Sequence, residues 1–147
     1  MRSDASACLV RPADCASTTC FLSLTPWELR PVERARALAL AACRAWQVDG
    51  DDLVLVMVEI LTNAFKHAVL SPDGRVLVRI YWRKHSAEIV LDVVVPQTRF
   101  ELPESVDLDW EEESGRGLTI VRNLARTFSC EEHAPGHLTF TAVVEAA

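Results

Sequence analysis

The sequence lacks the features that mark several common classes of protein. It has no run of basic residues, and its formal net charge is −6. Because phosphate contacts need clustered lysine and arginine, we do not expect nucleic acid as a direct partner. No apolar run approaches the ~20 residues of a membrane span, and the first residues lack the apolar core of a signal peptide. We therefore expect a cytoplasmic protein that makes no contact with a membrane.

Paired cysteines are also lacking. The five cysteines form no C-x-x-C pair and no tight Cys/His cluster of the zinc type. Reduced thiols are the simplest expectation. Three of these residues, Cys8, Cys15 and Cys20, lie close together near the N-terminus, where redox sensing, metal binding and no specific role all stay open.

The length and composition indicate one globular domain. The chain has 147 residues, of which 50% are hydrophobic and 24% are charged, and it contains no internal repeat or heptad pattern. Residues 1–19 are small and polar without periodicity, so we predict a loose tail there. Residues 20–147 should form the single domain.

The most informative stretch is residues 51–68, which we predict to be one long helix. At about 100° per residue, its aliphatic side chains cover most of the helix surface. A polar seam within about 140° is formed by Asp52, Glu59, Thr62, Asn63, Lys66 and His67. Because a buried polar group without a partner costs about 1–3 kcal/mol, this seam either lines a cavity or forms a solvated edge.

Further elements are predicted before this helix. Residues 20–24 should form a short edge strand. Thr25 and Glu28 have the spacing of a capping box, which indicates that a helical turn begins near residue 25. Pro31 interrupts that turn, and residues 32–46 should form the next helix.

Beyond the long helix, the periodicity changes to that of strands. Residues 75–82 and 88–95 alternate and are rich in β-branched side chains, so we predict an antiparallel hairpin. Residues 96–114 should form a long acidic loop, of a length typical of lids and binding loops. Residues 118–128 are predicted to be a helix, and residues 137–144 the last strand.

A glycine-rich turn precedes the helix predicted at residues 118–128. Gly115, Arg116 and Gly117 would leave backbone N–H groups free at the positive end of the helix dipole, which suits an anion. A tight turn with no ligand is the alternative explanation.

Two motifs in this order resemble a known superfamily. LVMVEILTNAFKHA, at residues 55–68, looks like the N-box of the Bergerat-type ATPases, which include the histidine kinases and gyrase. ESGRGLTIVRNLA, at residues 113–125, looks like their second glycine box and the helix after it. The chain most closely resembles the small anti-sigma-factor serine/threonine kinases that are common in actinobacteria.

This resemblance implies a fold and a set of roles. The fold is an α/β (α+β) two-layer sandwich, the Bergerat ATP-binding fold, with helices on one face of a mixed, mostly antiparallel sheet. Asn63 would hold Mg²⁺ and Glu59 would act as the catalytic base. For His67, pairing with carbonyls at the helix end is the alternative to nucleotide contact. The implied nucleotide-binding positions are Asn63, His67, Val95, Gly115, Arg116, Gly117 and Leu118.

One of these positions departs from the family pattern. Members that bind ATP carry an aspartate at the end of the second hairpin strand, where this sequence has Val95. Asp92 is the nearby carboxylate, but its strand parity places it on the opposite face of the sheet. ATP and Mg²⁺ are therefore the cofactors that the resemblance implies, although the residue that reads adenine is missing.

Two functions stay open. The first is an ATP- and Mg²⁺-dependent protein kinase that sequesters a sigma factor or phosphorylates an antagonist protein. The second is a degenerate binding module of the same fold that needs no nucleotide. In either case the acidic loop should attract a basic protein surface, with Glu111, Glu112 and Glu113 as the expected partner-binding residues. The resemblance also allows a homodimer.

Overall fold

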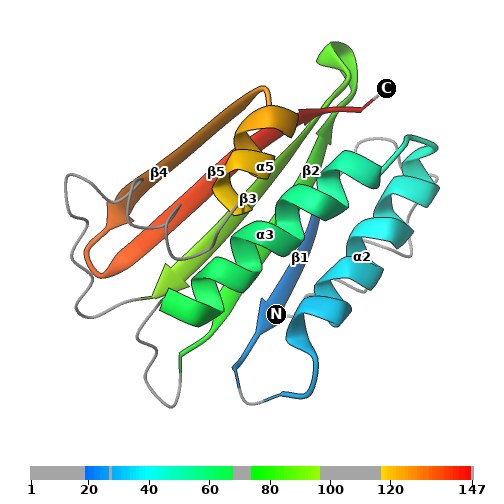
Figure 1. Ribbon diagram of the computed structural model, residues 1–147. Helices are drawn as coiled ribbons and strands as arrows, with labels where there is room; N and C mark the ends of the chain where they lie inside the picture. The colour runs from blue at the N-terminus through cyan, green and yellow to red at the C-terminus, as the bar shows by residue number, and fades with distance from the viewer. Residues whose placement is uncertain (1–18, 27, 68–73, 97–116, 147) are drawn as a thin grey trace.

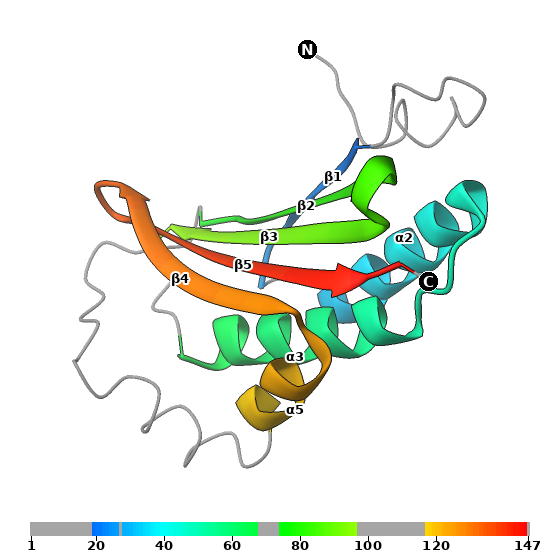
Figure 2. The same cartoon turned by 90° about the horizontal axis from the view of Figure 1, so that it is seen from above.

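The computed structural model describes residues 19–26, 28–67, 74–96 and 117–146. These residues form two layers, an antiparallel sheet and a layer of helices on one of its faces (Figures 1 and 2). The elements in chain order are β1 (Thr19–Leu24), α2 (Pro31–Trp46), α3 (Asp51–His67), β2 (Val76–Arg83), the short 3₁₀ helix η1 (Lys84–Ser86), β3 (Glu88–Pro96), α5 (Gly117–Leu124), β4 (Thr127–Ala134) and β5 (His137–Glu145).

The sheet has the strand order β1-β2-β3-β5-β4, and β3 lies at its centre. All of the described strand pairs are antiparallel. Successive side chains of β3 point to opposite faces, and residues of both faces are buried, such as Leu91 and Val93 on one face and Val90 and Asp92 on the other. We refer below to the helix face, which α2, α3 and α5 cover, and to the open face on the other side.

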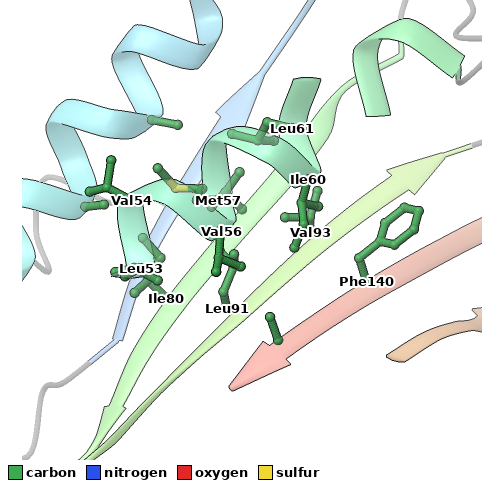
Figure 3. Packing of buried hydrophobic residues seen from close by; sticks show 14 of the residues in the cluster. Leu53, Val54, Val56, Met57, Ile60, Leu61, Ile80, Leu91, Val93 and Phe140 are labelled. Atoms are coloured by element: carbon green, nitrogen blue, oxygen red, sulfur yellow. The ribbon is translucent and has the colours of Figure 1, made fainter. Parts of the chain in front are cut away.

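The core lies between α3 and the helix face. Figure 3 shows Leu53, Val56 and Ile60 of α3 directed towards β2 and β3, while Leu61 and Met57 occupy the neighbouring stripe of the helix. All five side chains are almost fully buried. The strands complete this core with Ile80, Leu91, Val93 and Phe140. The apolar surface of α3 thus determines how the helix is seated and which of its side chains can reach solvent.

The segment between β1 and α2 is fixed by reciprocal capping. The Thr25 amide donates to Glu28 Oε2 at 2.7 Å, and the Glu28 amide donates to Thr25 Oγ1 at 3.3 Å. The capping box predicted from the sequence is therefore present, although the regular helix begins only at Pro31.

A close approach joins the end of α2 to the start of α3. A Cβ atom added to Gly50 would lie 2.8 Å from Cys43 Sγ, so no larger residue fits there without a shift. Burial, reinforced by Asp49, raises the pKa of the Cys43 thiol to about 11. The described cysteines are Cys20, Cys43 and Cys130, and none of them forms a disulfide bond.

Two predictions about the elements are wrong. The helix predicted at residues 118–128 ends at Leu124, and an unpredicted strand, β4, begins at Thr127. Phe128 and Cys130 pack against the core from this strand, which the helical spacing of the preceding residues obscured. The mixed sheet implied by the resemblance is purely antiparallel over the described strands.

Candidate functional site

The polar seam of α3 divides into an exposed edge and a buried group. Asp52, Thr62 and Lys66 are exposed, and Glu59 is half-buried. Asn63 is only 1% exposed, and it is the buried polar side chain of this helix within its described part. The solvated edge expected from the sequence is therefore present at Asp52, Thr62 and Lys66. Asn63 faces the interior, and a cavity along the seam stays a prediction.

The Asn63 side chain lacks a partner that its burial would normally require. Its Nδ2 atom makes no hydrogen bond within the described residues. Buried polar atoms are nearly always paired, and an unpaired one costs about 1–3 kcal/mol. A 180° rotation of the amide would place Oδ1 in the same position, so this site can present either a donor or an acceptor to a ligand.

Glu59 lies one helical turn before Asn63, at the i, i+4 spacing that puts two side chains on the same side of a helix. Its side chain is half-buried, so the carboxylate is held on a helix and can still be reached from solvent. The pair therefore offers a carboxylate beside a buried amide. His67 is the last residue of α3, and its side chain lies outside the described part of the structure.

The helix that follows the glycine-rich turn packs beside α3. α5 begins at Gly117, with Leu118 in its first turn, and contacts α3 (Figure 1). α5, the helix after the second glycine box, therefore lies beside α3, which carries Asn63, although β2 and β3 separate the two helices in sequence. Gly115, Arg116, Glu111, Glu112 and Glu113 lie outside the described residues.

The central strand presents only aliphatic side chains to the helices. Val95 is 1% exposed and pairs with Leu138 on β5. The other β3 residues of the same parity are Ile89, Leu91 and Val93, which are all fully buried. No carboxylate of β3 therefore faces the helices, whichever of these positions is aligned with the adenine-reading aspartate of the family.

Asp92 lies on the open face, as its strand parity predicts, and it is fully occupied there. Arg79 Nε on β2 donates to Asp92 Oδ2 at 2.9 Å, and the Arg79 Nη2 atom donates to the same oxygen. Thr141 Oγ1 on β5 donates to Asp92 Oδ1 at 2.7 Å. Because both carboxylate oxygens are engaged across three strands, Asp92 cannot replace the missing aspartate.

Sequence reasoning did not find this Arg79, Asp92 and Thr141 cluster. The alternation of residues within β2 and β5 indicates which face of the sheet Arg79 and Thr141 occupy. It does not give the register between strands, which places both residues opposite Asp92.

The described residues contain no group of three or more His, Cys, Asp or Glu side chains that could hold a metal ion by themselves. Among the described helices, none has the length and apolar character needed to cross a membrane.

The family model described as "Histidine kinase-like ATPase domain" matches residues 25–142. The chain belongs to this family. The match covers most of the chain and agrees with an α+β fold in which an antiparallel sheet carries its helices on one face. A search of the curated proteins gave no match. Membership in the histidine kinase-like ATPases suggests a regulatory role and the binding of ATP and Mg²⁺.

Proposed function

We propose that this protein is a regulator of the anti-sigma-factor kinase type. It binds ATP with Mg²⁺ and either sequesters a sigma factor or phosphorylates an antagonist protein on serine or threonine. One observation carries the proposal: the amide of Asn63 is buried in α3 with Nδ2 unpaired, in a family whose members bind ATP. A partner that completes its hydrogen bonding or coordination explains why the asparagine is there.

The residues that are present fit the phosphate half of such a site. The amide oxygen of Asn63 is a hard ligand of the kind that Mg²⁺ accepts alongside water and phosphate oxygens. Bound Mg²⁺ would neutralise the charge that develops on the transferred phosphoryl group. α5, which begins at Gly117, packs against α3, and Gly115 and Arg116 precede it in sequence. Free N–H groups and an arginine in this turn suit phosphate oxygens.

Glu59 is the proposed catalytic base. Its carboxylate is half-buried, one turn from Asn63, where a hydroxyl of a docked protein could reach it. It would take the proton from that hydroxyl as the oxygen attacks phosphorus, as in other protein kinases.

Calorimetric titration with ATP and ADP, with and without Mg²⁺, tests this proposal. We expect micromolar, Mg²⁺-dependent binding by the wild type and at least about tenfold weaker binding by Asn63→Ala, because a metal ligand is lost. Thr62→Ala is the matched control, since Thr62 is the exposed neighbour on the same helix and should bind as the wild type does. Equal binding by Asn63→Ala would remove Asn63 from the site.

A second candidate is a nucleotide-independent binding module of the same fold. The aliphatic helix face of β3 favours it, because neither Val95 nor Asp92 can accept a hydrogen bond from adenine. Loss of a hydrogen bond to a charged group costs about 1.5–3 kcal/mol, or about 10- to 100-fold in affinity. Failure of the wild type to bind ATP, together with binding by a Val95→Asp variant, would select this candidate.

For either candidate, Glu111, Glu112 and Glu113 are the proposed contacts to a basic partner surface. Their reversal to lysine should weaken binding of the cognate partner, most strongly at low salt, where charges are least screened. An unchanged dissociation constant at all salt concentrations would exclude this acidic segment as the partner surface.

A further inference from the structure

Asn63 lies near the C-terminal end of β3, because α3 and β3 run in the same direction and contact each other (Figure 1). Figure 3 shows Ile60 of α3 and Val93 of β3 directed towards each other. Asn63 follows Ile60 by three residues, or about 4.5 Å along a helix. Val95 follows Val93 by two residues, or about 7 Å along a strand. A ligand held by Asn63 therefore lies near the part of the sheet that carries Val95.

This part of the sheet is apolar. On β3 and β5, every side chain on the helix face is apolar and at most 4% exposed, and we call these residues the apolar wall. They are Ile89, Leu91, Val93 and Val95 on β3 and Leu138, Phe140, Ala142 and Val144 on β5. Phe140 also stacks on Phe128 of β4, with the ring centroids 6.3 Å apart. Over the full length of β3 and β5, which the structure describes, the apolar wall thus gives a ligand no side-chain hydrogen bond.

The apolar wall cannot distinguish one nucleotide base from another. Bases differ in their hydrogen-bonding edges, since adenine carries an amino donor where guanine carries an oxygen acceptor. A protein that discriminates strongly between such ligands places a matching polar group against the edge. Asp92, the carboxylate nearest to Val95 in sequence, is engaged by Arg79 and Thr141 on the open face. Apolar side chains favour neither base.

The polar group on α3 suits a different part of the ligand. Asn63 is 1% exposed, and its Nδ2 atom is unpaired among the described residues. Its amide can ligate Mg²⁺ through oxygen or donate to a phosphate oxygen through nitrogen. All nucleoside triphosphates share these groups, so neither contact depends on the base.

We infer that the site selects its ligand by the magnesium-bound polyphosphate and does not read the base. The inference rests on the proposed function, because it takes Asn63 as a contact of Mg²⁺ or phosphate. Its ligand class is the nucleoside triphosphates in general. Inorganic tripolyphosphate, which has no base, is the minimal ligand of this kind.

Calorimetric titration with ATP, GTP and inorganic tripolyphosphate, each with Mg²⁺, tests this inference. For the wild type we expect the dissociation constants of ATP and GTP to agree within about threefold, and that of tripolyphosphate to lie within about tenfold of ATP. Asn63→Ala should weaken the binding of all three ligands by the same factor, because the lost contact is to the part that they share.

Val95→Asp supplies the missing acceptor. In this variant ATP should bind at least about tenfold more tightly than GTP, because a carboxylate accepts a hydrogen bond from the amino group of adenine and repels the oxygen of guanine. Val94→Asp is the matched control, since it adds the same charge one residue away on the open face and should leave ATP and GTP equal. Circular dichroism shows whether each variant folds, and the wild-type constants decide the test if Val95→Asp does not.

Equal binding of ATP and GTP by the wild type, with tripolyphosphate in the stated range, supports the inference. A preference of the wild type for ATP beyond threefold would overturn it and leave the proposed function standing. Weaker binding of tripolyphosphate would also overturn it, because the base or ribose would then supply much of the affinity. A folded Val95→Asp variant without preference for ATP would overturn it too, since the base would not lie at the apolar wall. If none of the three ligands binds, the proposed function itself fails, and the inference fails with it.

Discussion

Asn63 and Asp92 are the two buried polar side chains of the described residues, and their surroundings differ. Asp92, on the open face, has Arg79 and Thr141 as partners for its two oxygens. Asn63, on the helix side, leaves its Nδ2 atom unpaired. A satisfied buried group stabilises the fold, whereas an unsatisfied one costs stability, so the difference identifies Asp92 as structural and Asn63 as the candidate ligand-binding residue.

The largest expected effect comes from removing the satisfied carboxylate. Asp92→Ala should lower the free energy of unfolding by about 2 kcal/mol, less than for a fully buried pair because Arg79 is 44% exposed. Urea denaturation measures this loss. Glu145→Ala removes an exposed carboxylate of the same face and should change stability little. If both substitutions lowered the free energy of unfolding equally, the buried position of Asp92 would not make its ion pair more stabilising than an exposed one.

A smaller effect is expected at the third member of the cluster. Thr141→Val keeps the shape of the side chain and removes the hydroxyl that donates to Asp92. The free energy of unfolding should fall by about 1 kcal/mol. In a double-mutant cycle with Asp92→Ala, most of this loss should vanish, and full additivity would show that the two groups are not coupled.

Glu28 is another satisfied carboxylate, and its effect depends on pH. Partial burial opposes its ionisation, but the Thr25 amide and the Arg34 guanidinium outweigh this and hold the pKa of Glu28 below its usual 4.5. The stabilisation is therefore fully present above pH 4.5 and is lost as the pH falls through the lower folded-state value.

Glu28→Gln tests this pH dependence. At pH 7 the variant should be less stable by about 0.5–1 kcal/mol in urea denaturation. The difference from the wild type should shrink as the pH falls below 4.5. A difference that stays constant from pH 7 to about pH 3 would contradict the pKa assignment.

The smallest effect on stability is expected at Asn63. Asn63→Leu replaces an unsatisfied amide with an apolar side chain of similar size, so the free energy of unfolding should stay within about 1 kcal/mol and tend to rise. Urea denaturation, read beside Asp92→Ala, measures the contrast. A loss as large as that of Asp92→Ala would show that Asn63 already has the partners it needs.

Much of the fold followed from periodicity in the sequence. The helix predicted at residues 51–68 is α3, and the hairpin predicted at residues 75–82 and 88–95 is β2 and β3. These segments are long and strongly patterned, so local spacing and tertiary packing agree. β4 was missed because the spacing of Leu118, Val121, Leu124 and Ala125 suggested that the helix continues, whereas its Phe128 and Cys130 join the sheet core.

The candidate site was only partly accessible from the sequence. Strand parity correctly predicted that Asp92 turns away from the helices. The unpaired state of Asn63 could not be predicted, because it depends on which atoms the packing of α3 and α5 brings near the amide. The roles assigned to Glu59, Asn63 and the glycine-rich turn remain predictions.

The most direct test of the contrast between Asn63 and Asp92 is to measure how much a ligand stabilises the protein. The free energy of unfolding is measured with and without ATP and Mg²⁺ for the wild type, Asn63→Leu and Thr141→Val. At 100 times the dissociation constant, a bound ligand should add about 2.7 kcal/mol. We predict that the wild type and Thr141→Val gain equally. Asn63→Leu should gain less by at least about 1.3 kcal/mol, because binding at least about tenfold weaker lowers the gain at the same ligand concentration. An equal gain in Asn63→Leu, or no gain in the wild type, would contradict the assignment of Asn63 to a nucleotide site.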